Sequence, residues 1–137
     1  MAKTHCISHP ASAQIVIIRE EYLAICDKNH CAAAILNIFE YWTDIKLGQR
    51  EQAQAENEIA IGGNAPPVDD SLWIYKSIPD LKKELMGLFG VSKIGKAVDL
   101  LKSKGFIDSR NNPKYGWDRT LQYEFKTENV QKAIHTL

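Results

Sequence analysis

The sequence has no long apolar run, no secretory leader pattern and too few cysteines for a disulfide framework. No stretch approaches the ~18 apolar residues that a membrane-spanning helix needs, and no basic, then apolar, then small-residue order marks a leader. Three cysteines among 137 residues are an odd number, typical of reduced thiols. We therefore expect one cytoplasmic domain, without a membrane partner, that folds around a core without disulfides or metal.

Motifs of common enzyme classes are also missing. The sequence has no nucleophile elbow, no glycine-rich phosphate loop ending in Lys-Ser or Lys-Thr, and no His-Glu-x-x-His. The carboxylate pairs Glu20–Glu21 and Asp69–Asp70 are neighbours along the chain, which favours a solvated surface over general acid–base chemistry. We expect no enzymatic activity and no cofactor.

The formal net charge is zero, but the charges are unevenly divided along the chain. Residues 1–70 contain 5 Lys and Arg against 10 Asp and Glu, a balance of −5, whereas residues 71–137 contain 12 against 7, a balance of +5. A local excess of cations attracts phosphates even when the whole chain is neutral. If the protein binds nucleic acid, we expect the second half to do so.

Two short helices joined by a tight turn are predicted in the basic half. Apolar residues recur at helical spacing over 78–86, and Gly87–Gly90 contains two glycines that suit a turn. Ser92 is the expected N-cap of a second helix over 93–104. Gly105 is suited to end that helix.

The periodicity then changes to that of strands. Residues 106–110 predict a strand, residues 111–116 have turn composition, and residues 120–126 alternate between apolar and polar side chains. Residues 72–75 predict a third strand that pairs with this hairpin. The predicted order is helix, tight turn, helix and hairpin.

This segment resembles the winged-helix domains of phage and plasmid replication proteins. It reads WIYKSIPDLKKELMGLFGVSKIGKAVDLLKSKGFIDSRNNPKYGWDRTLQYEF, from Trp73 to Phe125. In that family a strand beginning with Trp precedes the first helix, a Leu…Lys-Gly-Phe-Ile sequence closes the second, and an Asp-Arg-Thr-x-x-Tyr element opens the last strand. The sequence AAAILNIFEYWTDI, from Ala32 to Ile45, is similar to the preceding helix of those proteins.

Residues 1–47 are predicted to form an N-terminal extension and the first core helix. Residues 1–13 are polar and aperiodic, so we expect a mobile end. The β-branched run Gln14–Ile18 predicts a short buried strand or an extended segment. The pattern of residues 19–26 is too short to assign a conformation. The longest helix is expected over about 30–47, where a broad apolar stripe suits burial.

Residues 48–70 form an unusually long connection. Residues 49–56 contain helix formers but no apolar face, which is compatible with a solvated extension of the helix. Gly62–Pro67 predicts a loop, and we expect the connection to be flexible because it has little to bury. Residues 127–137 predict a C-terminal helix. Pattern and resemblance together predict an α+β, mostly helical fold: a single winged helix-turn-helix domain over 1–137, with an N-terminal helical extension and a short three-stranded sheet.

The second predicted helix and the hairpin supply the candidate DNA-binding residues. Cations on the outer face of the helix suit phosphates or base edges in a major groove, and the hairpin tip suits phosphates or a minor groove. The candidates are Ser92, Lys93, Lys96, Arg110, Asn112, Lys114, Tyr115 and Arg119. Arg119 is also suited to a structural pair with Asp118, and outward lysines are also common on surfaces that only meet water. The helix contains no Arg, Asn or Gln, so strong base readout is not expected from it.

A cluster of cysteines and histidines contains suitable ligands for a zinc site. All three cysteines and three of the four histidines fall within residues 5–31. Cys6-x-x-His9 followed by Cys26-x-x-x-His30 has spacings that can close a tetrahedral site. However, the first pair lies in the segment expected to be mobile, and Cys31 lies on an apolar stripe where buried free thiols are common. We therefore expect no metal.

The predicted function is binding of double-stranded DNA. The resemblance implies replication initiation on a phage or mobile-element genome, with other replication proteins as partners, and transcription regulation uses the same geometry. Helix-turn-helix proteins often pair, and the predicted homodimer contact is the C-terminal helix through Val130, Ala133, Ile134 and Leu137. The alternative is a protein-interaction module without DNA contact. Cations gathered on the second helix and hairpin favour DNA, whereas scattered cations favour docking.

Overall fold

The computed structural model describes residues 5–59, 71–111 and 121–137, apart from the side chains of residues 53, 54 and 56–59. Within these residues the chain has an α+β fold with five helices and a three-stranded antiparallel sheet. The elements are α1 (Glu20–Ile25), α2 (His30–Ile59), β1 (Trp73–Tyr75), α3 (Ile78–Glu84), α4 (Val91–Ser103), β2 (Ile107–Asn111), β3 (Leu121–Phe125) and α5 (Thr127–His135). Parts of the expected mobile end (1–4), flexible connection (60–70) and hairpin tip (112–120) lie outside the described residues.

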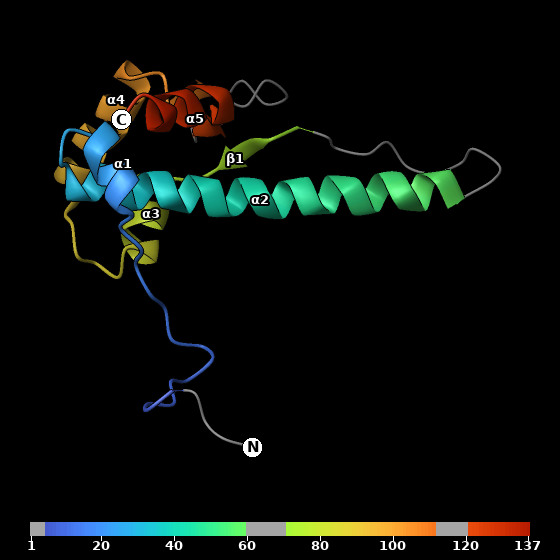
Figure 1. The fold of residues 1–137 in the computed structure, drawn as a ribbon, viewed down its shortest axis with the longest axis horizontal. Helices are drawn as coiled ribbons and strands as arrows, with labels where there is room; N and C mark the ends of the chain where they lie inside the picture. The colour runs from blue at the N-terminus through green and yellow to red at the C-terminus, as the bar shows by residue number, and fades with distance from the viewer. Residues whose placement is uncertain (1–4, 60–70, 112–120) are drawn as a thin grey trace.

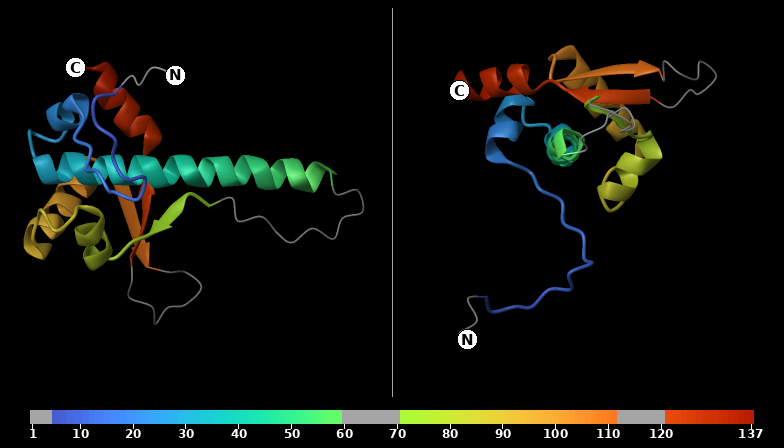
Figure 2. Two further views of the ribbon diagram at one scale, coloured as in Figure 1. Left: turned by 90° about the horizontal axis from the view of Figure 1, so that it is seen from below. Right: turned by 90° about the vertical axis from the view of Figure 1, so that its right-hand side faces the viewer.

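Helix α2 lies at the centre of the fold. Helix α2 runs horizontally in Figure 1. In the left view of Figure 2, α1 and α5 lie on one side of it, and α3, α4 and the sheet lie on the other. Residues 31–36 are buried in succession, so the first turns of α2 are covered on nearly all sides. The ring centroids of Phe39 and of Tyr123 on β3 are 5.2 Å apart, and the angle between the two ring planes is 42°. The apolar stripe predicted for this helix is therefore its core-facing surface.

Helix α2 is longer than the expected 30–47. It continues to Ile59, and its second half extends well beyond the packed body of the protein (Figure 1). The expectation of a flexible connection over 48–70 was therefore wrong for residues 48–59, which continue α2. The alternative for residues 49–56, an extension of the helix, describes them. Polar residues with good helix propensity can continue a helix whose first half is fixed by packing.

The segment before α1 is extended but is not a buried strand. Residues 14–18 form no strand, and Ile15, Ile17 and Ile18 are all exposed. Only Val16 is partly buried against the core. The prediction of a buried strand was wrong, because the described sheet consists of β1, β3 and β2 and does not include this run; the alternative of an extended segment describes it.

The predicted pair of helices forms, with two differences at its caps. Helix α3 ends at Glu84, and Met86 and Gly87 both take left-handed backbone conformations, with φ of 57° and 70°. Helix α4 begins at Val91, so Ser92 lies in its first turn and is not the N-cap. Gly90 takes that position with an extended backbone, and its carbonyl accepts from Ile94 N–H at 3.0 Å. Serine can cap a helix only where its own backbone is non-helical.

The end of α4 agrees with the sequence. Gly105 has a φ of 76°, which favours glycine. The N–H of Phe106 donates to the carbonyl of Leu101, and the N–H of Gly105 donates to that of Lys102, both at 3.0 Å. These two bonds form the Schellman motif expected of a C′ glycine.

The sheet has the strand order β1-β3-β2, with both pairs antiparallel. Ile74 pairs with Tyr123, and both are buried against the helices. The next residues along each strand point the other way, which places Tyr75, Gln122 and Arg110 in one cross-strand row. The predicted hairpin and third strand are confirmed.

Helix α5 packs on the chain's own core. Val130 is buried, and Ala133 and Ile134 are partly buried against the core. Of the four apolar residues predicted to contact a second copy, only Leu137 is largely exposed. Intramolecular packing therefore covers part of the apolar face predicted for a homodimer contact, and that contact stays a prediction.

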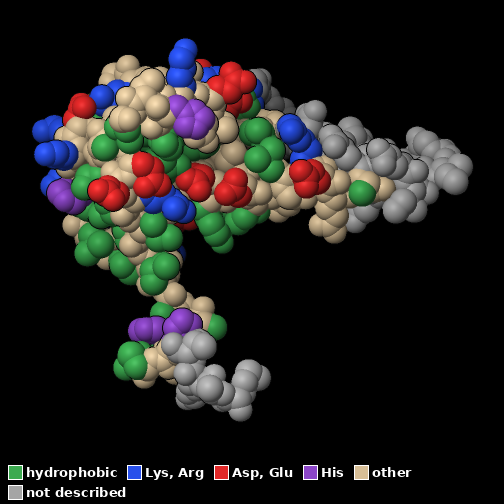
Figure 3. All heavy atoms as spheres, in the orientation of Figure 1, with side chains coloured by type: hydrophobic (Ala, Val, Ile, Leu, Met, Phe, Trp, Pro, Cys, Tyr) green, Lys and Arg blue, Asp and Glu red, His purple; other side chains and the backbone are tan. Residues whose placement is uncertain are grey.

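Charge is distributed by element as well as by sequence. A row of acidic side chains follows α1 and α2 across one face of the molecule (Figure 3). Exposed lysines lie on α3 and α4, at positions 82, 83, 93, 96 and 102. Among the described helices, none is long and apolar enough to cross a membrane.

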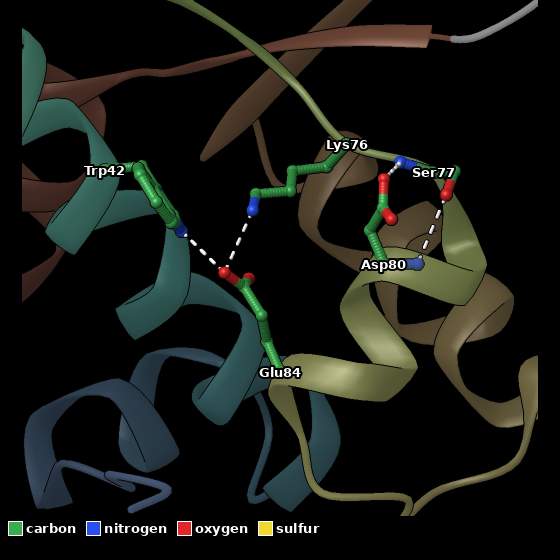
Figure 4. Close-up of polar contacts among 5 residues, drawn as sticks. All are labelled: Trp42, Lys76, Ser77, Asp80 and Glu84. Atoms are coloured by element: carbon green, nitrogen blue, oxygen red, sulfur yellow. Dashed lines mark hydrogen bonds and ion pairs between the residues drawn. The ribbon is translucent and has the colours of Figure 1, made fainter. Parts of the chain in front are cut away.

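A polar cluster holds α3 against α2 (Figure 4). The indole N–H of Trp42 and the ammonium group of Lys76 both donate to Oε1 of Glu84, at 2.8 Å and 2.9 Å. The Lys76 Nζ also lies 4.2 Å from the centroid of the Trp42 ring. The three side chains are largely shielded from water, so they depend on one another for hydrogen bonds. Ser77 and Asp80 add a capping box at the start of α3.

Removing the shared acceptor should destabilise the fold. We expect Glu84→Ala to lower the free energy of unfolding by about 2–3 kcal/mol, because two shielded donors lose their partner. Glu84→Gln keeps an acceptor for Trp42 and should cost less. The measurement is urea denaturation followed by tryptophan fluorescence. Asp99→Ala, which removes an exposed carboxylate of α4, serves as the control; equal midpoints for the Glu84→Ala and Asp99→Ala variants would contradict the role of this cluster.

Candidate nucleic-acid interface

Helix α4 has one face committed to the core and one face open. Ile94, Ala97, Val98 and Leu101 are buried, and they pack mainly against α2 and α3. Near the start of α4, the Cys31 thiol of α2 lies 4.0 Å from the carbonyl oxygen of Lys93, the limit for a weak sulfur hydrogen bond. Because the inner face is fixed in this way, the direction of the outer face is fixed as well.

The outer face presents the three helix residues that the sequence singled out. Ser92, Lys93 and Lys96 are all exposed, and the two lysines lie about one turn apart. The Lys93 Nζ lies 5.6 Å from the centroid of the Phe89 ring, which places the cation beside the α3–α4 turn. The start of α4 has no side-chain cap, so the N–H groups of its first turn also lack side-chain acceptors there.

Gly95 lies between these two lysines in the sequence, inside α4. A methyl group added at Gly95 would meet no atom from another part of the chain within 4 Å. Packing therefore does not require a glycine here, although glycine costs about 1 kcal/mol relative to alanine inside a helix. The residue keeps this part of the outer face free of any side chain.

Arg110 makes contacts within the chain that the sequence did not indicate. Its Nε donates to Oε1 of Gln122 on β3 at 2.8 Å, and its guanidinium carbon lies 4.2 Å from the centroid of the Trp73 ring on β1. The side chain thus crosses the sheet on the face opposite the core and is half-buried. A guanidinium stacked on an aromatic ring keeps its in-plane N–H donors, so the group can still bind an anion at its edge.

The remaining hairpin candidates lie outside the described residues. They are Asn112, Lys114, Tyr115 and Arg119, as well as Asp118, the alternative structural partner of Arg119. The described part of the interface is therefore the outer face of α4 together with Arg110.

The cysteines and histidines of residues 5–31 are not brought together. Cys26 and Cys31 are fully buried in the apolar core, whereas Cys6, His9 and His30 are exposed. Within the described ranges, no group of three or more His, Cys, Asp or Glu side chains has an arrangement that can hold a metal ion. Burial raises the pKa of the Cys26 thiol to about 11, partly offset by the charge of Lys104, and burial also raises the pKa of Cys31.

Sequence reasoning missed two sets of contacts near the site. The first is the cluster of Trp42, Lys76 and Glu84, which come from α2, the connection between β1 and α3, and α3. The second is the stack of Arg110 on Trp73, which depends on the strand order, because β3 lies between β2 and β1. Alternation along each strand places both residues on the outer face, but the strand order itself had no sequence signal.

Comparison with protein-family models, with curated proteins and with solved structures finds no match for this chain.

The different settings of the three thiols predict different reactivities. Under native conditions we expect a disulfide reagent such as DTNB to modify Cys6 rapidly and Cys26 and Cys31 slowly, because burial shields the last two and disfavours their thiolates. The release of thionitrobenzoate gives one fast and two slow equivalents, and all three react quickly in denaturant. Cys6→Ser should abolish the fast phase. A fast phase of two or more equivalents in the native wild-type protein would contradict the burial of these thiols.

Proposed function

We propose that this chain is a winged helix-turn-helix protein that binds double-stranded DNA, with α4 as the helix that faces the duplex. The order α2, β1, α3, α4, β2, β3 supports this, since it is the order of helices and strands in a winged helix. The strand order β1-β3-β2 supports it too, because the hairpin then extends from the strand that pairs with β1.

The observation that carries the proposal is the outer face of α4. The packing of Ile94, Val98 and Leu101 turns Lys93 and Lys96 away from the core, and Gly95 leaves the helix surface on the other side of Lys96 without a side chain. A helix that enters a major groove needs such a face, with cations for phosphates and room for close approach. The exposed lysines of α3 and α4 make the surrounding surface basic, which favours DNA over a docking role.

The chemistry of this face favours backbone contacts over base readout. Lysine binds phosphate as a point charge, whereas bidentate recognition of bases uses Arg, Asn or Gln, which α4 lacks. Arg110 can add a phosphate contact from the sheet. The protein therefore binds duplexes with modest sequence preference through this helix. By its sequence resemblance to replication proteins of phages and plasmids, it acts in replication initiation on such a genome; regulation of transcription is the second role that fits this geometry.

The two lysines provide the main test. Each phosphate contact releases counterions and contributes about −0.9 to the slope of log K against log salt concentration. Lys93→Ala/Lys96→Ala should therefore flatten the slope by roughly 1.8 and weaken binding to all duplexes alike. The measurement is fluorescence anisotropy with random-sequence duplex over a series of salt concentrations, with circular dichroism to check the fold.

A matched control removes the same charge elsewhere. Lys28→Ala/Lys132→Ala changes two exposed lysines on the α1–α2 turn and on α5, and should leave the slope nearly unchanged. If the Lys93/Lys96 variant folds normally and binds with the wild-type slope, α4 does not face DNA and the docking role becomes the better explanation.

Gly95 allows stability and binding to be separated. Gly95→Ala should raise the free energy of unfolding by about 0.5–1 kcal/mol, because alanine has the higher helix propensity and the added methyl group meets no neighbour. If the uncovered backbone lies against DNA, the same variant should bind duplex more weakly despite its greater stability. Thermal melts and anisotropy measured on one preparation test both effects. Stabilisation with unchanged binding would show that the backbone at residue 95 does not approach DNA.

A further inference from the structure

Two exposed surfaces combine apolar side chains with charges of opposite sign. The arm surface consists of the segment before α1 and the adjoining parts of α1 and α2. It contains Ile15, Ile17, Ile18, Tyr41, Glu20, Glu40 and Asp44, and its apolar members are between 41% and 75% exposed. The turn surface consists of the end of α3, the α3–α4 turn and the start of α4. It contains Lys82, Lys83, Met86, Leu88 and Val91, and its apolar members are between 46% and 61% exposed.

The arm surface has an apolar part and an acidic part that adjoin on α2. Ile15, Ile17 and Tyr41 line one pocket of about 350 Å³ between the arm and α2. Glu40 and Asp44 line the neighbouring pocket between α1, α2 and α5. Asp44 lies one helical turn beyond Tyr41 on α2, and Glu20 begins α1 directly after the arm. Arg19 joins the two parts, since its guanidinium contacts Glu40 at 3.7 Å and donates to Asn37 at 2.7 Å. Figure 3 shows the resulting row of acidic side chains with hydrophobic side chains beside it.

The turn surface is basic and apolar in the same way. Lys82 and Met86 are one turn apart, and the N–H of Gly87 donates to the Lys82 carbonyl at 3.0 Å, which fixes the turn to the end of α3. Glu84, next to Lys83 in the chain, points to Trp42 and Lys76 (Figure 4). Asp80, three residues before Lys83, is an exposed carboxylate on the same helix. Met86 holds a left-handed backbone conformation, which is unfavourable for a side-chain-bearing residue, and yet its side chain is about half exposed.

We propose that the arm surface of one copy of this chain binds the turn surface of a second copy. Carboxylates at the arm face lysines at the turn, while the isoleucines and Tyr41 cover Met86, Leu88 and Val91. Charge complementarity selects the second copy as the partner, because the chain itself presents the matching surface. The two surfaces differ, so copies associate either head-to-tail in a row or as a closed pair in which both contacts form. This contact uses neither Lys93 nor Lys96. Lys82 and Lys83 also belong to the basic surface around α4, so self-association is measured without DNA.

Charge reversal tests the pairing. In sedimentation velocity at low salt, the average mass of the wild-type protein should rise with concentration. Glu20→Lys/Asp44→Lys and Lys82→Glu/Lys83→Glu should each raise the dissociation constant at least about tenfold, because like charges then oppose each other. The chain with all four substitutions should regain self-association, since both surfaces are reversed and match again. An equimolar mixture of the two double variants should also associate, in alternating order.

Controls distinguish this contact from general changes in charge or fold. Lys102→Glu/Lys132→Glu lowers the net charge by the same amount as Lys82→Glu/Lys83→Glu but outside the turn surface, and should behave as the wild type does. Circular dichroism of every variant checks the fold. If the wild-type protein keeps the mass of one chain at all concentrations, the proposal fails. It fails equally if the fourfold variant associates no better than the folded double variants, because the charges then do not meet across the contact.

Discussion

Burial of the first turns of α2 is the interaction on which the rest of the structure depends. Residues 31–36 and Phe39 are buried, and α2 contacts α1, α4, β1 and β3. Each large apolar side chain buried in this way contributes about 1.5–3 kcal/mol. Helix α4 and the sheet are oriented by packing on this one helix, so the direction of the outer face of α4 follows from the core. The second half of α2 has no such partner in the described part of the fold and extends from the body as a polar helix.

Polar contacts at both ends hold the short helix α3 in place. Helix α3 has 7 residues, which is too short to be stable in isolation. Its start is capped by Ser77 and Asp80. Hydrogen bonds from Ser77, first from its backbone N–H and then from its side chain, hold the pKa of the Asp80 carboxyl below its usual range. Its end is held by Glu84 through Trp42 and Lys76. These contacts set where α3 ends, and therefore where the turn to α4 begins.

Acidic and basic side chains lie on different elements of the fold, so different surfaces attract different partners. Acidic side chains follow α1 and α2, and lysines follow α3 and α4, although the formal net charge is zero. At moderate salt, screening limits the distance over which exposed charges act to about 10 Å. A surface therefore attracts a partner through its local charge and not through the net charge of the chain. A neutral chain can therefore bind a polyanion at one surface and a copy of itself at another.

The sequence by itself determined the elements and their order. The helical spacing over 78–101, the glycine at 105 and the alternation over 120–126 each encode a local conformation, and α3, α4 and β3 form where these patterns occur. It also determined which side of α4 is apolar, because a helix with a fixed period has a fixed inner face. The lysines of the outer face follow from the same pattern.

Only the tertiary structure decided which groups meet. Gln14–Ile18 is as β-branched as a buried strand, yet it stays exposed because the sheet does not include it. The apolar face of α5 suits a partner equally well in sequence, but α1 and the core cover it. Arg110 reaches Trp73 only because β3 lies between their strands, and Glu84 meets Trp42 only because α3 packs on α2. Such contacts join residues far apart along the chain, and no local preference specifies which of several chemically suitable partners will be near.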